Sequence, residues 1–107
     1  MAFKFNNSNG YNRSTAEKAI NGENIYLVGL ELETQYEYVN NERTNNVTGY
    51  QIWVATPSHN PFKIKFSVDE QPNLENFNIG DIVTFDNLEA IQIRNNVYFR
   101  ASKIKKG

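Results

Sequence analysis

The chain has 107 residues, a formal net charge of −1 and no cysteine. This length favours one domain with a modest core, and the absence of cysteine excludes disulfides, thiolate metal sites and a cysteine nucleophile. The near-neutral charge argues against strong nucleic-acid binding without excluding it, because a local basic patch matters more than the sum. No apolar run is long enough to span a membrane, and the first residues lack a signal-peptide core. We therefore expect a cytoplasmic protein without membrane contact.

The chain is expected to divide into an N-terminal segment, residues 1–24, and a β-barrel domain, residues 25–107. Residues 1–13 are polar and rich in asparagine. They predict an arm, or an edge strand around Phe3 and Phe5.

A short helix is expected after this arm. Ser14 is followed three residues later by Glu17, which is the spacing of a capping box at a helix start. Asn21 and Gly22 favour the end of the helix. A helix of barely two turns needs tertiary packing to persist.

Residues 25–39 alternate in polarity and predict one long strand. One side of this strand changes from apolar to acidic near Gly29, and a glycine inside a strand often marks a bend. Such a bend lets a first strand pair at both ends of a small barrel. Residues 40–46 then predict a polar loop, in which Arg43 is a candidate for contacts with bases or sugars.

Residues 47–68 predict two strands joined by the turn at residues 56–61. Alternation places Trp53 on the same side as Lys63 and Lys65, away from the core. The expected core positions on these strands are Tyr50, Ile52, Val54, Phe62, Ile64 and Phe66.

The expected register follows from parity and turn length. It pairs Ala55 with Lys63, Trp53 with Lys65 and Gln51 with Ser67. The preceding hairpin is expected to place Glu33 opposite Trp53 and Gln35 opposite Gln51. Weak ion pairs of Glu33 with Lys65 and of Glu31 with Lys63 are expected across the sheet.

The last third of the chain predicts two more strands. A loop or helical turn at residues 69–78, anchored by Leu74 and Phe77, leads to a strand at residues 82–91. The last strand, residues 97–104, directs Tyr98 and Arg100 outward, and it can lie beside the third strand. Five strands favour a closed barrel, because closure removes exposed sheet edges.

The segment from Ile79 to Ala101, which includes "IGDIVTFDNLEA" and "VYFRA", resembles the final hairpin of OB-fold proteins. Residues 25–104 as a whole are similar to a family of small proteins encoded by integrative and conjugative elements. One branch of that family is described as a helicase processivity factor that resembles single-stranded DNA-binding proteins. The resemblance implies an all-β, five-stranded OB-like barrel with a short N-terminal helix. An SH3-like barrel or a small sandwich is the alternative fold.

No catalytic constellation is apparent. The single histidine, His59, lies in a turn and is interpreted as a solvated side chain, and it has no partner at metal-ligand spacing. Glu31, Glu33 and Glu37 line one strand face, which we interpret as solvated rather than as a carboxylate pair. We expect no enzyme activity, no metal and no cofactor.

The leading hypothesis is a non-enzymatic, single-stranded nucleic-acid-binding accessory protein, since the outer face of strands two and three is the usual oligonucleotide platform of OB-folds. Trp53 and Tyr98 would stack on bases, and Lys63, Lys65 and Arg100 would contact phosphates. The full set of candidate binding residues is Trp53, Lys63, Lys65, Tyr98, Arg100, Gln51 and Arg43. The resemblance implies a role in replication or conjugative transfer of a mobile element, with single-stranded DNA and a helicase or relaxase as partners.

Two other interpretations of the same face stay open. In the first case the N-terminal helix covers Trp53, and in the second case the face binds another protein. In the second case the chain is an interaction module for a helicase, relaxase or other partner and makes no DNA contact. The basic C-terminal cluster of Arg100, Lys103, Lys105 and Lys106 is either a phosphate-binding track or a solvated end.

Overall fold

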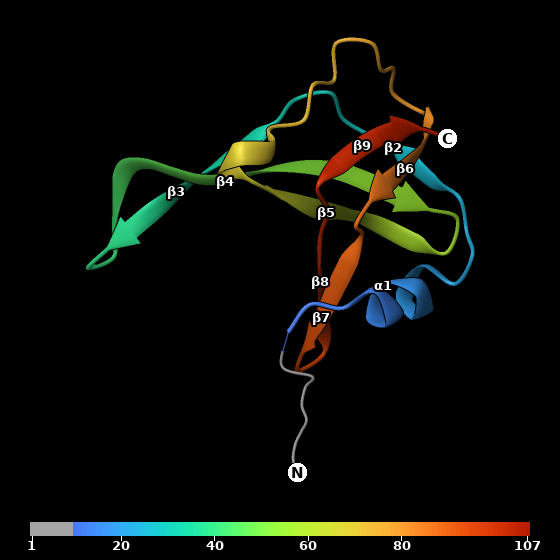
Figure 1. Ribbon diagram of the computed structural model, residues 1–107, viewed down its shortest axis with the longest axis horizontal. Coiled ribbons are helices and arrows are strands. Elements are labelled where there is room, and N and C mark those ends of the chain that lie inside the picture. The colour runs from blue at the N-terminus through green and yellow to red at the C-terminus, as the bar shows by residue number, and fades with distance from the viewer. Residues whose placement is uncertain (1–9) are drawn as a thin grey trace.

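The computed structural model describes residues 10–107, so the arm around Phe3 and Phe5 lies outside the described residues. The described chain is mostly β-structure with one short helix (Figure 1). Its elements are α1 (Arg13–Ile20), β2 (Ile25–Leu27), β3 (Glu33–Val39), β4 (Glu42–Thr56), β5 (His59–Ser67), the 3-10 turn η1 (Val68–Glu70), β6 (Ile82–Asp86), β7 (Glu89–Ile93), β8 (Asn96–Arg100) and β9 (Lys103–Lys106). Within residues 10–107, no helix has the length and apolar character needed to cross a membrane.

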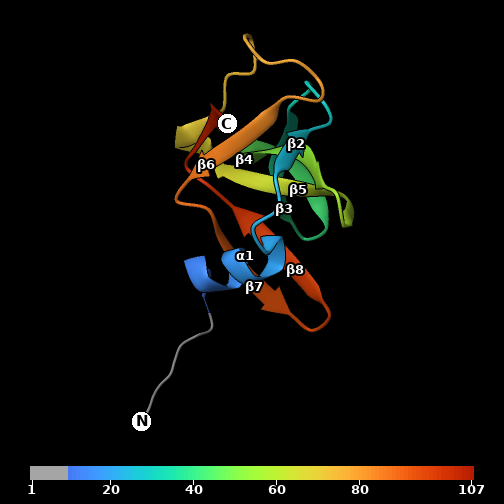
Figure 2. The same ribbon diagram turned by 90° about the vertical axis from the view of Figure 1, so that its right-hand side faces the viewer.

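The strands form one open sheet in the order β7-β8-β5-β4-β2-β6-β9, and β3 pairs with β4 outside this path. A closed barrel of five strands is therefore not confirmed. Each of three predicted strands is instead divided in two: β2 and β3, β6 and β7, and β8 and β9. Asn87, between β6 and β7, has a positive φ of 55°, which breaks the regular extended backbone there. Both ribbon views place α1 beside β7 and β8, far from the C-terminus (Figures 1 and 2).

The core lies on the inward side of β4 and β5, as predicted. Ile52, Val54, Ile64 and Phe66 are fully buried, and the predicted core residues Tyr50 and Phe62 are partly buried. Leu27 and Val83 join them from β2 and β6. Ala16 and Ile20 of α1 belong to the same buried cluster, so the helix and the sheet share one core.

The β3–β4 hairpin is longer than predicted and projects from the rest of the molecule (Figure 1). Its turn consists of Asn40 and Asn41, both with positive φ, 52° and 67°. Two consecutive left-handed residues make the tight turn that suits a two-residue hairpin, and asparagine tolerates this conformation. The expected polar loop at residues 40–46 is therefore wrong, since β4 begins at Glu42.

The register between β4 and β5 is two residues away from the prediction. Trp53 pairs with Lys63, Gln51 with Lys65 and Gly49 with Ser67. The strands continue to Thr56 and His59, so the turn is only Pro57 and Ser58 rather than six residues. Glu33 likewise pairs with Gln51 instead of Trp53. A shift of two residues preserves the side of the sheet on which each side chain lies, so the predicted faces are correct.

The helix begins two residues earlier than the Ser14 capping box predicts. Asn12 is the N-cap, and its side-chain oxygen accepts a 2.7 Å hydrogen bond from the Thr15 backbone N–H. The helix ends as predicted at Asn21, which adopts the left-handed conformation.

We expect Asn12→Ala to lower the free energy of unfolding by about 1 kcal/mol, because the Thr15 N–H loses its acceptor. The backbone bonds of Asn12 to Ala90 do not need the side chain. Ser14→Ala is the matched control, with an expected change of less than about 0.5 kcal/mol at an exposed position. Urea unfolding followed by circular dichroism measures both. A larger loss in Ser14→Ala than in Asn12→Ala would contradict this assignment of the cap.

Candidate nucleic-acid interface

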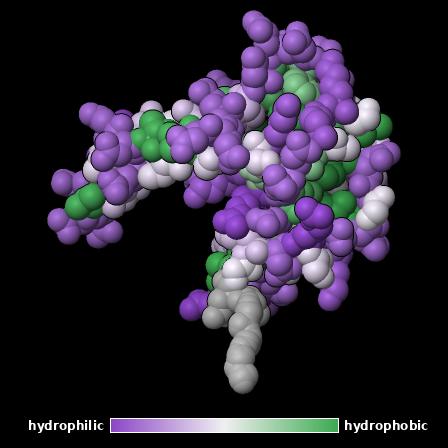
Figure 3. All heavy atoms as spheres, in the orientation of Figure 1, coloured by the Kyte–Doolittle hydropathy of each residue, from purple (hydrophilic) through white to green (hydrophobic). Residues whose placement is uncertain are grey.

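A groove runs across the outer sides of β4, β5 and β8. It consists of two adjoining pockets of about 470 and 410 Å³ that share Tyr11 and Lys65. Thr48 at the root of the projecting hairpin and Glu89 on β7 both line the second pocket. This places the second pocket between the β3–β4 hairpin and the end of the molecule that carries β7 and β8, where the surface is concave (Figure 3). The visible surface around the concavity is predominantly hydrophilic (Figure 3).

Strand pairing explains why the candidate residues converge. β5 pairs in parallel with β8, as the sequence suggested for the third and fifth strands, and Lys65 is the register partner of Arg100. Gln51 pairs with Lys65 from the other side, so Gln51, Lys65 and Arg100 form one row across three strands. Six of the seven predicted residues line the groove: Trp53, Lys63, Lys65, Tyr98, Arg100 and Gln51. Arg43 does not, because it lies near the tip of the hairpin with its guanidinium 4.4 Å from the Tyr36 ring centre.

Trp53 contacts one acidic and one basic side chain. Its indole N–H donates a 2.8 Å hydrogen bond to Glu33, and the Lys63 ammonium lies 3.0 Å from the other oxygen of the same carboxylate. The ammonium also lies 4.9 Å from the centre of the Trp53 ring. The hydrogen bond from Trp53 and then that from Lys63 hold the pKa of Glu33 below its usual value of 4.5. In this arrangement Glu33 accepts from the same donors that a ligand oxygen would use.

A second charged cluster surrounds Arg100. Its guanidinium lies 2.9 Å from the Glu89 carboxylate and 4.2 Å from the ring centre of Tyr11. Tyr11 was not predicted as a groove residue. The backbone of its neighbour Asn12 exchanges hydrogen bonds of 2.9 and 3.0 Å with Ala90 on β7, which brings Tyr11 to the groove. This is a contact between distant segments, and no local pattern in the sequence signals it.

The remaining cations differ in their partners. Lys65 forms no ion pair within 4.0 Å among residues 10–107, in contrast to Lys63 and Arg100. Lys105 lies 2.7 Å from Asp86, and the Lys106 ammonium lies 5.6 Å from the centre of the Phe77 ring. The basic C-terminal cluster therefore does not converge on the groove, apart from Arg100.

The helix does not cover Trp53. α1 packs against β7, and among residues 10–24 only Tyr11 lines the pocket that contains Trp53. His59 is more than a solvated turn residue, since its Nδ1 lies 2.8 Å from the Thr56 hydroxyl and 3.6 Å from Glu23. No group of three or more potential metal-ligating side chains occurs in the described part of the chain.

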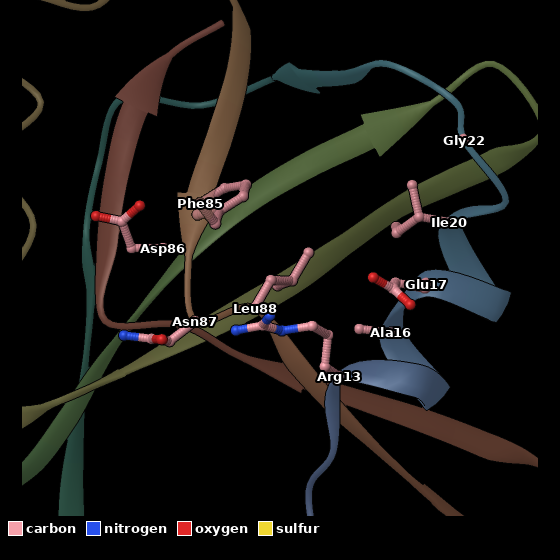
Figure 4. A pocket seen from close by; sticks show the side chains of 9 residues that line it. All are labelled: Arg13, Ala16, Glu17, Ile20, Gly22, Phe85, Asp86, Asn87 and Leu88. Carbon is pink, nitrogen blue, oxygen red and sulfur yellow. The ribbon is translucent and has the colours of Figure 1, made fainter.

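A larger pocket of about 770 Å³ lies between α1 and the β6–β7 connection (Figure 4). Ala16, Ile20, Phe85 and Leu88 supply its apolar lining. It shares no residue with the candidate set. Pocket size alone thus does not select the interface. The groove is the candidate because aromatic and basic side chains converge there.

Comparison of the chain with protein-family models, with curated proteins and with solved structures finds no match. The groove is therefore the feature from which we infer the function.

Proposed function

We propose that this protein is a non-enzymatic, single-stranded nucleic-acid-binding accessory protein with an OB-like fold. Strand connectivity supports the OB-like description. β2 pairs with both β4 and β6, and β5 pairs in parallel with β8. If β2–β3, β6–β7 and β8–β9 are each counted as one bent strand, the neighbours of the five resulting strands are those of an OB barrel.

The observation that carries the functional proposal is the aromatic and basic groove on the outer side of β4, β5 and β8. Trp53, Tyr98 and Tyr11 supply ring faces, and stacking of a base on an aromatic side chain contributes about 1–3 kcal/mol without sequence preference. Lys65, which has no ion-pair partner among residues 10–107, supplies a positive charge between them, while Lys63 and Arg100 need to exchange a carboxylate partner for a phosphate. This arrangement favours weak, sequence-tolerant binding of a flexible strand over the recognition of a rigid duplex.

The biological setting of this proposal comes from the resemblance of residues 25–104 to small proteins of integrative and conjugative elements. We propose that the protein assists replication or transfer of such an element in the cytoplasm. A helicase or relaxase that handles the same single strand is the proposed protein partner.

A second candidate function is a protein-interaction module that does not contact DNA. It is favoured by the internal ion pairs, since Glu33 and Glu89 neutralise two of the three groove cations. The chain as a whole is also near neutral, with a charge of −1. An acidic partner surface could bind Lys65 in the same way as a phosphate would.

Titration with oligo-dT, followed by tryptophan fluorescence at low salt, separates the two candidates. The chain has a single tryptophan, so the signal reports on Trp53 alone. We expect saturable quenching that weakens as salt is added, because phosphate contacts release counterions. In the double variant Lys63→Ala/Lys65→Ala, the slope of log affinity against log salt should be shallower by about 1.4, which corresponds to two lost phosphate contacts.

The matched control is Lys105→Ala/Lys106→Ala, which removes the same charge away from the groove and should keep the slope. Equal losses in both double variants would show that net charge, not the groove, attracts the DNA. An absence of quenching at any oligonucleotide concentration would favour the protein-interaction module.

A further inference from the structure

In the part of the chain that the structure describes, the edges of the sheet are protected against pairing with other chains, except along β3. β9 is four residues long and three of them are lysines. β7 is bridged by the backbone of Asn12. The part of β4 that pairs with β3 carries the extra residues at both register shifts of the β3–β4 ladder. The opposite edge of this part of β4 is therefore irregular. Short strands, lysines, covering segments and bulges are the usual protections of exposed edges.

β3 has none of these features. It is seven residues long, ETQYEYV, and contains neither lysine nor proline. In the β3–β4 ladder it contributes no extra residue, so its own backbone is regular. Its exposed side chains include Tyr38 and Val39, which are 65% and 50% exposed. It belongs to the hairpin that projects away from the rest of the molecule (Figure 1).

Among residues 10–107, no strand pairs with the edge of β3 that faces away from β4, so this edge presents unpaired backbone groups at alternate residues. The carbonyl of Glu37 accepts a 2.9 Å hydrogen bond from the Thr44 hydroxyl, so it faces β4. Successive residues of a strand direct their backbone groups to opposite edges. The N–H and C=O groups of Thr34, Tyr36 and Tyr38 therefore point away from β4.

We propose that β3 pairs antiparallel with β3 of a second copy of this chain, across a two-fold axis at Tyr36. This register pairs Tyr36 with Tyr36, Thr34 with Tyr38, Gln35 with Glu37 and Glu33 with Val39. The outward backbone groups of residues 34, 36 and 38 then face one another, as the hydrogen-bonded pairs of an antiparallel ladder require. No acid faces an acid, although β3 contains two of them, and the axis places one aromatic ring beside its symmetry mate. A second copy is the occupant that this strand fits, because the sequence is complementary to itself in this register.

Sedimentation velocity over a wide range of protein concentration tests the dimer. We expect concentration-dependent dimerisation, and Tyr36→Lys should weaken it about tenfold, because two ammonium groups then face each other where two rings did. Tyr98→Lys is the matched control. It makes the same substitution at an exposed residue of β8, a strand with a neighbour on each side, and should leave dimerisation unchanged. A monomer at every concentration would overturn the proposal, as would a dimer that Tyr36→Lys does not weaken.

Cysteine cross-linking tests the register independently of affinity. The chain has no cysteine, so a single introduced thiol reports one position. Facing residues in an antiparallel ladder have Cα atoms about 4.5–5.5 Å apart, which a disulfide can span. Tyr36→Cys should cross-link with itself. Thr34→Cys should cross-link only when mixed with Tyr38→Cys, and Tyr98→Cys should not cross-link. Cross-linking of Thr34→Cys alone as fast as that of Tyr36→Cys would overturn the proposed pairing. The β3 variants leave every residue of the candidate groove intact, and the Tyr98 variants serve only as controls for dimerisation and cross-linking.

Discussion

Gly49→Ala is expected to destabilise the protein by about 3 kcal/mol, at the upper end of the usual effect of overpacking. Gly49 is buried on β4, next to the pairing of Tyr50 with Phe66. A Cβ at this position would lie 2.6 Å from the carbonyl oxygen of Phe66 and 3.3 Å from the Lys65 side chain. The lysine can move, but the carbonyl belongs to the β4–β5 ladder, so the two strands must separate locally.

Gly29→Ala is the matched control for this prediction. The nearest atom to a Cβ at residue 29 is the Cβ of Trp53 at 3.9 Å, which is ordinary contact. We expect a change within about 0.5 kcal/mol, since the lower entropy of the unfolded chain offsets small adjustments. Urea unfolding monitored by circular dichroism gives both values from the midpoint at constant slope. Equal midpoints for the two variants would contradict the proposed clash at Gly49.

The faces of the strands were predictable from the sequence, whereas their register was not. Trp53, Lys63 and Lys65 lie on one side of β4 and β5 because side chains alternate, and this alternation survives a shift of two residues. The shift itself comes from the turn at Pro57 and Ser58. In the structure the Thr56 hydroxyl contacts His59 across this turn, and the two strands extend to these residues. A window of alternating residues does not encode that contact.

The alternation of polarity also did not predict that the long strands are divided. Residues 25–39 alternate in polarity throughout, yet only the ends, β2 and β3, are strands. The ends differ in their partners, since β2 pairs with both β4 and β6, while β3 pairs with β4 alone. The extent of a strand depends on the neighbours available to it, and these are set by tertiary structure.

The candidate groove was predictable in composition but not in its internal contacts. The alternation of side chains predicted that Trp53 and the two lysines share one face of the sheet. The resemblance to OB-folds suggested that this face binds nucleic acid. The observed register places Glu33 in one row with Gln51 and Lys65, but its carboxylate contacts Lys63 diagonally, so this ion pair was not predictable from the register. Tyr11 enters through the backbone bridge of Asn12 to Ala90, which joins residues far apart in the chain.

Glu33→Gln is expected to raise the affinity for oligo-dT about fivefold, which is the size of effect that an exposed ion pair supports. The glutamine oxygen still accepts the hydrogen bond from the Trp53 indole, so the ring keeps its position. Lys63, which lies 3.0 Å from the Glu33 carboxylate, loses its charged partner and becomes available to a phosphate. The salt slope should therefore become steeper by about 0.7, which corresponds to one additional phosphate contact.

The matched control is Glu75→Gln, which makes the same change of charge in the exposed loop between η1 and β6. It should alter affinity by less than twofold and leave the salt slope unchanged. A loss of affinity in Glu33→Gln would contradict the proposal that Glu33 competes with a phosphate for Lys63. It would show instead that Glu33 positions Lys63 for the ligand. Equal gains in both variants would assign the effect to net charge.

Glu33→Gln is also expected to change how the free energy of unfolding depends on pH. Hydrogen bonds from Trp53 and Lys63 lower the pKa of Glu33 below 4.5, so its contacts contribute to stability at neutral pH. A group with a lowered pKa in the folded state loses that contribution as the pH falls from 4.5 through the folded value. Glu33→Gln should therefore be less stable than the wild type near pH 7, and the difference should disappear under acid conditions. Urea midpoints measured across this range check the sign. A constant difference at all pH values would show that the carboxylate does not hold this network together, and Glu33 would then not be the competitor that a phosphate displaces from Lys63.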